Sequence, residues 1–130
     1  MTPRLLLLAT TTGYQARSFA EAARRLGLEV VFGTDRCHVL EDPWENAALP
    51  LRFEAPAYSA GLAADYARVN PLHAVVAVGD RPTVTAALVC RALGIPWHTP
   101  EAAEACLHKL RAREVCRQAG LRVPAFACCS

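Results

Sequence analysis

Two uninterrupted apolar runs dominate the hydrophobic pattern of the chain. They are Leu5–Ala9 near the start and Ala74–Val78 past the middle. A strand that is buried on both faces of a sheet has such a run, because neither face alternates with polar residues. We therefore predict that both segments are central strands of a parallel sheet.

Between these runs the periodicity changes first to that of a helix. Apolar residues recur at helical spacing from Ala16 to Leu26, and Gly27 indicates the helix end. Leu28–Phe32 then predicts a second strand. A strand–helix–strand unit of this length has parallel strands and a right-handed crossover.

The middle of the chain is less regular. His38–Pro50 has mixed polarity and predicts a loop or a short helical turn. Leu51–Glu54 alternates apolar and polar residues, which predicts a short strand. An apolar stripe from about Ser59 to Asn70 predicts a helix that ends before a proline.

The second apolar run is followed by a turn and a further helix. Gly79–Arg81 predicts the turn, Pro82 suits the start of a helix, and Gly94 suits its end. Ile95–His98 predicts a short edge strand, because its proline cannot donate a ladder hydrogen bond. Thr99 is a favourable N-cap for the next helix.

A last helix is predicted from about Leu107 to Ala119, with Gly120 as its cap. Strands and helices thus alternate along the whole chain. This alternation predicts an α/β fold with a Rossmann-like, doubly wound parallel sheet.

Composition narrows the functional class. A chain of 130 residues with 53% hydrophobic residues forms one domain with a sizeable core. The net charge of +2, without a basic block, argues against nucleic acid or an acidic membrane as the main partner. The initial apolar run is too short for a signal peptide or a bilayer span, so we expect a cytoplasmic protein.

Cysteine and histidine spacing gives no sign of a metal or a nucleophile. The six cysteines include no Cys-x-x-Cys motif, and the four histidines are scattered. No Ser/His/Asp or Cys/His arrangement is present in the spacing. We therefore predict neither a catalytic residue nor a metal site in this chain.

The candidate binding residues follow the predicted strands. In open α/β sheets ligands bind beyond the carboxyl ends of the strands. The loop after the first strand is not Gly-x-Gly-x-x-Gly, so it does not predict a dinucleotide site. Each candidate also has an alternative interpretation as an ordinary turn residue. The candidates for substrate binding are Thr12, Gly13, Tyr14, Asp35, Gly79, Asp80 and Arg81.

The last quarter of the chain carries a resemblance to a known family. Gly94–Pro96 is followed by a helix, then by Lys109 at the start of a second helix, and then by Ala119–Gly120 and Val123–Pro124. This order resembles the end of the N-terminal, pre-ATP-grasp domain of ATP-grasp enzymes. The family has an Asp-Lys pair where this chain has His108 before the lysine.

The resemblance covers nearly the whole chain. The first strand, the threonine-rich loop, the helix and the second strand are similar to those of biotin carboxylase, the large subunit of carbamoyl phosphate synthetase and the carboxylate–amine ligases. Val78–Asp80 stands where relatives carry a Gly-Glu or Pro-x-x-Glu element. The family lysine reaches the nucleotide phosphates, so the resemblance assigns an ATP phosphate contact to Lys109.

The resemblance implies a division of the chain and a function. Residues 1–106 would form the pre-ATP-grasp domain, and residues 107–130 the linker helix and the start of an ATP-grasp domain. The whole enzyme would join a small carboxylate to an amine or thiol, using ATP and Mg²⁺ that this part does not bind tightly. This part would not be catalytic alone, and it would contact the ATP-grasp body or a second copy.

Two alternatives from other functional classes remain at this stage. One is a stand-alone Rossmann-like module for binding or dimerisation. The other is the acceptor half of a two-domain sugar transferase, which also begins with a buried strand and a glycine-containing loop.

Overall fold

The computed structural model describes residues 1–10, 14–35 and 48–129. The elements in chain order are β1 (Arg4–Ala9), α1 (Tyr14–Arg25), β2 (Glu29–Thr34), β3 (Ala48–Pro50), α2 (Pro56–Val69), β4 (Ala74–Val78), α3 (Thr83–Leu93), α4 (Pro100–Leu107) and α5 (Lys109–Gln118). Among these described elements, strands and helices alternate up to α3, except that β3 follows β2 directly, and two further helices then end the chain.

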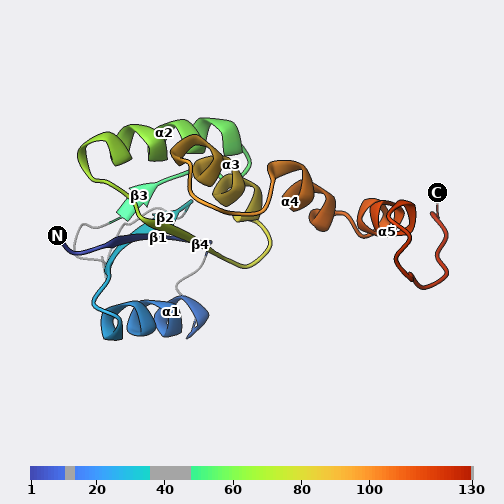
Figure 1. Ribbon diagram of the computed structural model, residues 1–130, viewed down its shortest axis with the longest axis horizontal. Helices are drawn as coiled ribbons and strands as arrows, with labels where there is room; N and C mark the ends of the chain where they lie inside the picture. Colours follow the sequence, from blue (N-terminus) through green and yellow to red (C-terminus); the bar gives the residue numbers. More distant parts are fainter. Residues whose placement is uncertain (11–13, 36–47, 130) are drawn as a thin grey trace.

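The sheet is parallel and has the order β3-β2-β1-β4. Helix α1 covers one face of the sheet, and α2 and α3 cover the other (Figure 1). In register, Leu8 of β1 lies opposite Gly33 of β2 and Ala77 of β4. The predicted α/β class with a doubly wound parallel sheet is confirmed.

The two apolar runs differ in position. β1 is central, and the side chains of Leu6, Leu7 and Leu8 are fully buried. β4 lies at the edge of the described sheet, and only Val75 of its residues is buried. The prediction that β4 is a central strand is therefore wrong. Its apolar run packs on α3 and on β1, but within the described residues no strand pairs with its outer side.

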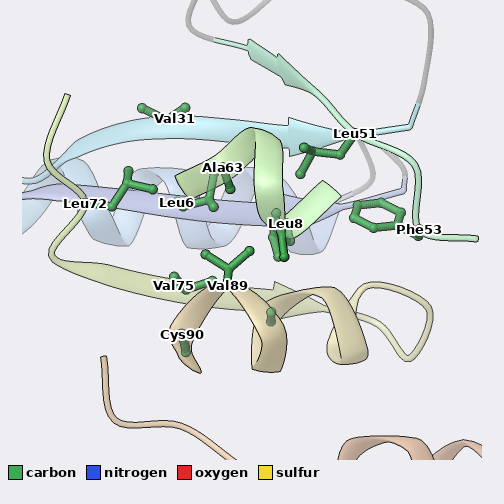
Figure 2. Packing of buried hydrophobic residues seen from close by; sticks show 12 residues of the cluster. Leu6, Leu8, Val31, Leu51, Phe53, Ala63, Leu72, Val75, Val89 and Cys90 are labelled. Atoms are coloured by element: carbon green, nitrogen blue, oxygen red, sulfur yellow. The ribbon is translucent and has the colours of Figure 1, made fainter. Parts of the chain in front are cut away.

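The main core lies between the sheet and the pair α2 and α3 (Figure 2). Side chains from β1, β2 and β4 meet small residues of the two helices there. Because these helix residues are small, the helices approach the sheet closely. The buried residues labelled in the figure are Leu6, Leu8, Val31, Leu51, Phe53, Ala63, Leu72, Val75, Val89 and Cys90.

The strand predicted at Leu51–Glu54 is wrong, although its alternation of faces is right. Leu51 and Phe53 are buried, whereas Arg52 and Glu54 are exposed. The strand is Ala48–Pro50 instead, within the segment predicted as a loop, whose residues before Ala48 lie outside the described residues. The buried Ser59 hydroxyl accepts from the Arg52 N–H and donates to the Arg52 carbonyl, both at 2.7 Å, so the backbone turns there.

The strand predicted at Ile95–His98 is also absent. Gly94 ends α3 with φ of +68°, and the Ile95 N–H donates to the Cys90 carbonyl at 2.9 Å. Ile95 and Trp97 still pack against the core, as alternate residues of a strand would. Packing explains the apolar pattern here, and no backbone pairing with β4 accompanies it.

The two last helices are joined at His108. Thr99 caps α4 as predicted, because its Oγ1 accepts from the Ala102 N–H at 3.2 Å. The backbone of His108 is extended, so α5 begins at Lys109 and not at Leu107. None of the residues of α5 is buried, and Figure 1 shows this helix beyond α4 and away from the sheet.

Candidate functional site

Three charged side chains meet at the carboxyl end of the sheet. Asp35 follows β2, Glu54 follows β3 by a few residues, and Arg81 lies in the turn after β4. The Arg81 Nη1 is 3.3 Å from the Asp35 Oδ2, and the Arg81 Nη2 is 3.6 Å from the Glu54 Oε2. One guanidinium therefore bridges two carboxylates, and we call this group the Arg81 cluster.

The members of the Arg81 cluster differ in exposure. The Asp35 side chain is 14% exposed, whereas those of Arg81 and Glu54 are 60% and 61% exposed. The Asp35 Oδ1 is buried and, within the described residues, has no hydrogen-bond partner. A buried acceptor without a partner is costly, so this oxygen is suited to a donor that a ligand supplies.

The chemistry of the cluster favours a polar ligand with an anionic group. A guanidinium has five N–H donors, and the two carboxylates occupy only some of them. The remaining donors can hold a carboxylate or phosphate in the forked geometry that arginine prefers. The Asp35 Oδ1 can accept a hydroxyl or amine hydrogen of the same ligand.

The turn after β4 is held in a defined shape. Gly79 has φ of +87°, a backbone conformation that favours glycine. The Thr83 hydroxyl donates to the Asp80 carbonyl at 2.6 Å, and the Thr83 N–H donates to the same oxygen at 3.2 Å. This turn positions Arg81 for its two carboxylates.

Asp80 belongs to a different place from Arg81. It lines a cavity of about 260 Å³ together with Trp97, His98 and residues of α4. The neighbouring residues of one turn thus serve two separate regions, one at the Arg81 cluster and one against α4. Sequence position alone indicated a single region.

The remaining predicted residues are placed as follows. Thr12 and Gly13 lie outside the described residues, and Tyr14 is the first residue of α1. Lys109 is the exposed first residue of α5, and none of the ion pairs among the described residues involves it. Among the predicted residues that the structure describes, Asp35 and Arg81 are the ones joined by an ion pair.

Sequence reasoning missed Glu54 and the cavity residues Trp97 and His98. Glu54 had one usable signal, because it follows a strand whose carboxyl end reaches the same edge. That signal was hidden, since Leu51–Glu54 was itself interpreted as the strand. Trp97 and His98 carry no spacing motif, and only packing shows their position.

Other chemistry is limited within the described residues. No group of three His, Cys, Asp or Glu side chains there could hold a metal ion. Burial raises the pKa of the Cys90 thiol to about 11, which disfavours the nucleophilic thiolate. In the same part of the chain, no helix is long and apolar enough to cross a membrane.

Comparisons with known proteins agree with this architecture. Among solved structures, an L-amino acid ligase from Bacillus licheniformis matches 97% of this chain with a TM-score of 0.77 and 22% identity, over 32% of its own length. A phosphoribosylglycinamide synthetase from Anaerococcus prevotii matches 92% with a TM-score of 0.65 and 21% identity, over 30% of its own length. The chain thus spans about a third of each.

Sequence comparison supplies the family. No match was found among curated proteins. Residues 20–97, which are more than half of the chain, match the sequence profile of the ATP-grasp N-terminal domain. This chain therefore belongs to the ATP-grasp N-terminal domain family.

Proposed function

We propose that this chain is the N-terminal, substrate-side domain of an ATP-dependent ligase that joins a carboxylate to an amine or a thiol. The observation that carries the proposal is the family match together with a fold that aligns with about a third of a ligase. On this proposal residues 1–106 form the domain, and residues 107–130 lead into an ATP-grasp body. The chain by itself binds but does not catalyse.

The Arg81 cluster is the proposed contact with the carboxylate substrate. Its guanidinium would hold the carboxylate, and the Asp35 Oδ1 would accept a hydrogen from the substrate. Thr12, Gly13, Tyr14 and Gly79 are further proposed substrate contacts, because they follow the sequences of β1 and β4. Ligands of open α/β sheets lie at this edge.

ATP and Mg²⁺ would be held mainly outside these 130 residues. Among the described residues there is no cluster of metal ligands, and Lys109 is the cation assigned to the nucleotide phosphates. ATP would supply the phosphoryl group that activates the carboxylate. The role of this chain would be to bind the carboxylate and to keep it oriented.

The first test concerns nucleotide binding by the 130-residue chain. We expect ATP with Mg²⁺ to bind with a Kd of about a millimolar or weaker, because one exposed lysine offsets little of the entropy lost on association. Lys109→Ala should leave the free energy of unfolding within about 0.5 kcal/mol of the parent value. Calorimetric titration measures the affinity, and a micromolar Kd that Lys109→Ala removes would contradict the proposal.

The second test concerns the carboxylate contact. We expect Arg81→Ala in the whole gene product to raise KM for the carboxylate at least about tenfold, since a charge-assisted fork contributes about 1.5–3 kcal/mol. Arg91→Ala is the matched control, because Arg91 is 61% exposed and also pairs with a carboxylate, that of Glu101. Carboxylate-dependent ADP release measures both variants.

Two outcomes would oppose this proposal. If Arg81→Ala and Arg91→Ala have equal effects on KM, the Arg81 cluster is not the carboxylate site. If the coding sequence ends after Ser130, the alternative of a stand-alone binding or dimerisation module is favoured. That alternative has one observation in its support, namely that α5 exposes Leu110 and Val115 and buries no residue.

A further inference from the structure

The cavity beside α4 has properties that the proposed carboxylate contact does not use. Its walls are the turn after β4, the extended segment with Trp97 and His98, and the exposed side of α4. Its volume of about 260 Å³ lies just below the roughly 300–1,000 Å³ of pockets for drug-sized ligands. A cavity of this size has room for a small molecule.

The walls of the cavity are mostly apolar. Trp97, Ala102, Cys106 and Leu107 line it, and Trp97 also packs against the buried core. The rings of Trp97 and His98 form a T-shaped pair, with 5.5 Å between ring centroids and 69° between ring planes. Such walls suit an aliphatic body of a few carbon atoms, because its transfer from water is favourable.

The charged group at the cavity is a carboxylate. Within the described part of the chain, the Asp80 side chain has no ion-pair partner. The adjacent Arg81 is engaged by Asp35 and Glu54 in the other direction. An ammonium group at the cavity would meet Asp80, and an indole face beside it also attracts cations.

We propose that this cavity binds a small primary amine with an aliphatic body, with its ammonium group at Asp80. The proposal rests on the proposed ligase function and names the class of its nucleophilic substrate. The carboxylate would be held at the Arg81 cluster and the amine at Asp80. Because Asp80 and Arg81 are consecutive, both proposed sites would adjoin the same turn.

The test is an NMR titration of the 130-residue chain with three ligands that share one aliphatic body. Isoamylamine, isoamyl alcohol and isovalerate have the same branched five-carbon skeleton, and its terminal carbon carries the amine, the hydroxyl or the two carboxylate oxygens. We expect saturable shifts of the Trp97 indole N–H and of the Ala102 and Cys106 amides. The affinity should fall in the order amine, alcohol, carboxylate. The amine should bind about 1.5- to 5-fold more tightly than the alcohol, because an exposed ion pair adds only a small free energy of binding.

Two variants separate the charge from the cavity. Asp80→Asn should remove the preference for amine over alcohol and leave alcohol binding unchanged. Asp65→Asn is its control, because Asp65 is an exposed carboxylate on α2 and does not line the cavity. Ala102→Leu should abolish saturable shifts for all three ligands, because the larger side chain fills the cavity.

Ala92→Leu is the control for the filled cavity. Ala92 is exposed on α3, outside the cavity lining. Its variant should bind like the parent. The dispersed amide spectrum of each variant shows that it is folded.

Several results would overturn the amine site. They are tighter binding of isovalerate than of isoamylamine, shifts that map to the Arg81 cluster, or unchanged binding in Ala102→Leu. An absence of saturable shifts in the folded parent has the same meaning. The Arg81→Ala kinetics do not depend on this titration, so the ligase proposal can stand while the amine site fails, and the reverse can also be recognised.

Discussion

Leu8→Ala is expected to lower the free energy of unfolding by about 2–5 kcal/mol. Leu8 is fully buried in β1, and its side chain belongs to the core between the sheet and the two helices α2 and α3. Removing this side chain leaves a cavity. Because β1 is paired with a strand on each side, it cannot shift to close that cavity. Urea unfolding followed by circular dichroism measures the loss.

Leu26→Ala is the matched control for this prediction. Leu26 follows α1 and is 75% exposed, so the same chemical change removes little buried surface. We expect a change of about 0.5 kcal/mol or less. Similar losses in the two variants would contradict the central position of β1.

Gly33→Ala is expected to lower the free energy of unfolding by about 1–3 kcal/mol, because the added methyl group overpacks the core. Inside a strand or helix, alanine is otherwise usually more stabilising than glycine. A Cβ at this position would overlap Leu8 and would lie 2.8 Å from the Leu51 Cδ1. Both leucines are buried, so neither can move into solvent. Differential scanning calorimetry measures the change.

Gly61→Ala is the matched control for Gly33→Ala. Gly61 is exposed in α2, and a Cβ there would meet nothing within 4 Å. The same substitution should raise the free energy of unfolding by about 0.5–1 kcal/mol, because glycine is a poor helix former. Opposite signs at the two glycines are the expected result.

The contact between Leu8 and Gly33 makes the two core predictions dependent on each other. In the double variant the added methyl group of Gly33→Ala enters the space that Leu8→Ala vacates. The combined loss should therefore be smaller than the sum of the single losses by about 0.5–3 kcal/mol. Additive losses would show that Leu8 does not occupy the space beside Gly33.

Local signals in the sequence were sufficient for most elements. The apolar run of β1, the apolar periodicity of α1 and the cap at Thr99 each depend on residues that are close in the chain. Such features act through backbone preferences and local hydrogen bonds, so they survive without knowledge of the partners. The α/β class follows from their alternation.

The errors have one common origin. β4 has the composition of a central strand but lies at the edge, and Ile95–His98 has the alternation of a strand but no pairing. Burial produces an apolar pattern whether the backbone pairs or not. Pairing requires a second strand at hydrogen-bonding distance. The residues of one segment do not indicate whether such a partner strand is present.

The candidate site was likewise predicted only in part from the sequence. The general rule for the carboxyl edge of parallel strands was enough to select Asp35 and Arg81, because each follows a predicted strand. It did not reveal Glu54, and it placed Asp80 with Arg81.

The sequence by itself determined the α/β class, the central strand β1, the helix cap and the selection of Asp35 and Arg81, which the structure shows as an ion pair. Only the tertiary structure decided which side chains of the edge meet. The directions of Asp80 and Arg81 depend on the turn at Gly79 and on the packing of Trp97 and α4. These contacts join residues far apart in the chain, and long-range packing leaves no periodic signal in a single sequence.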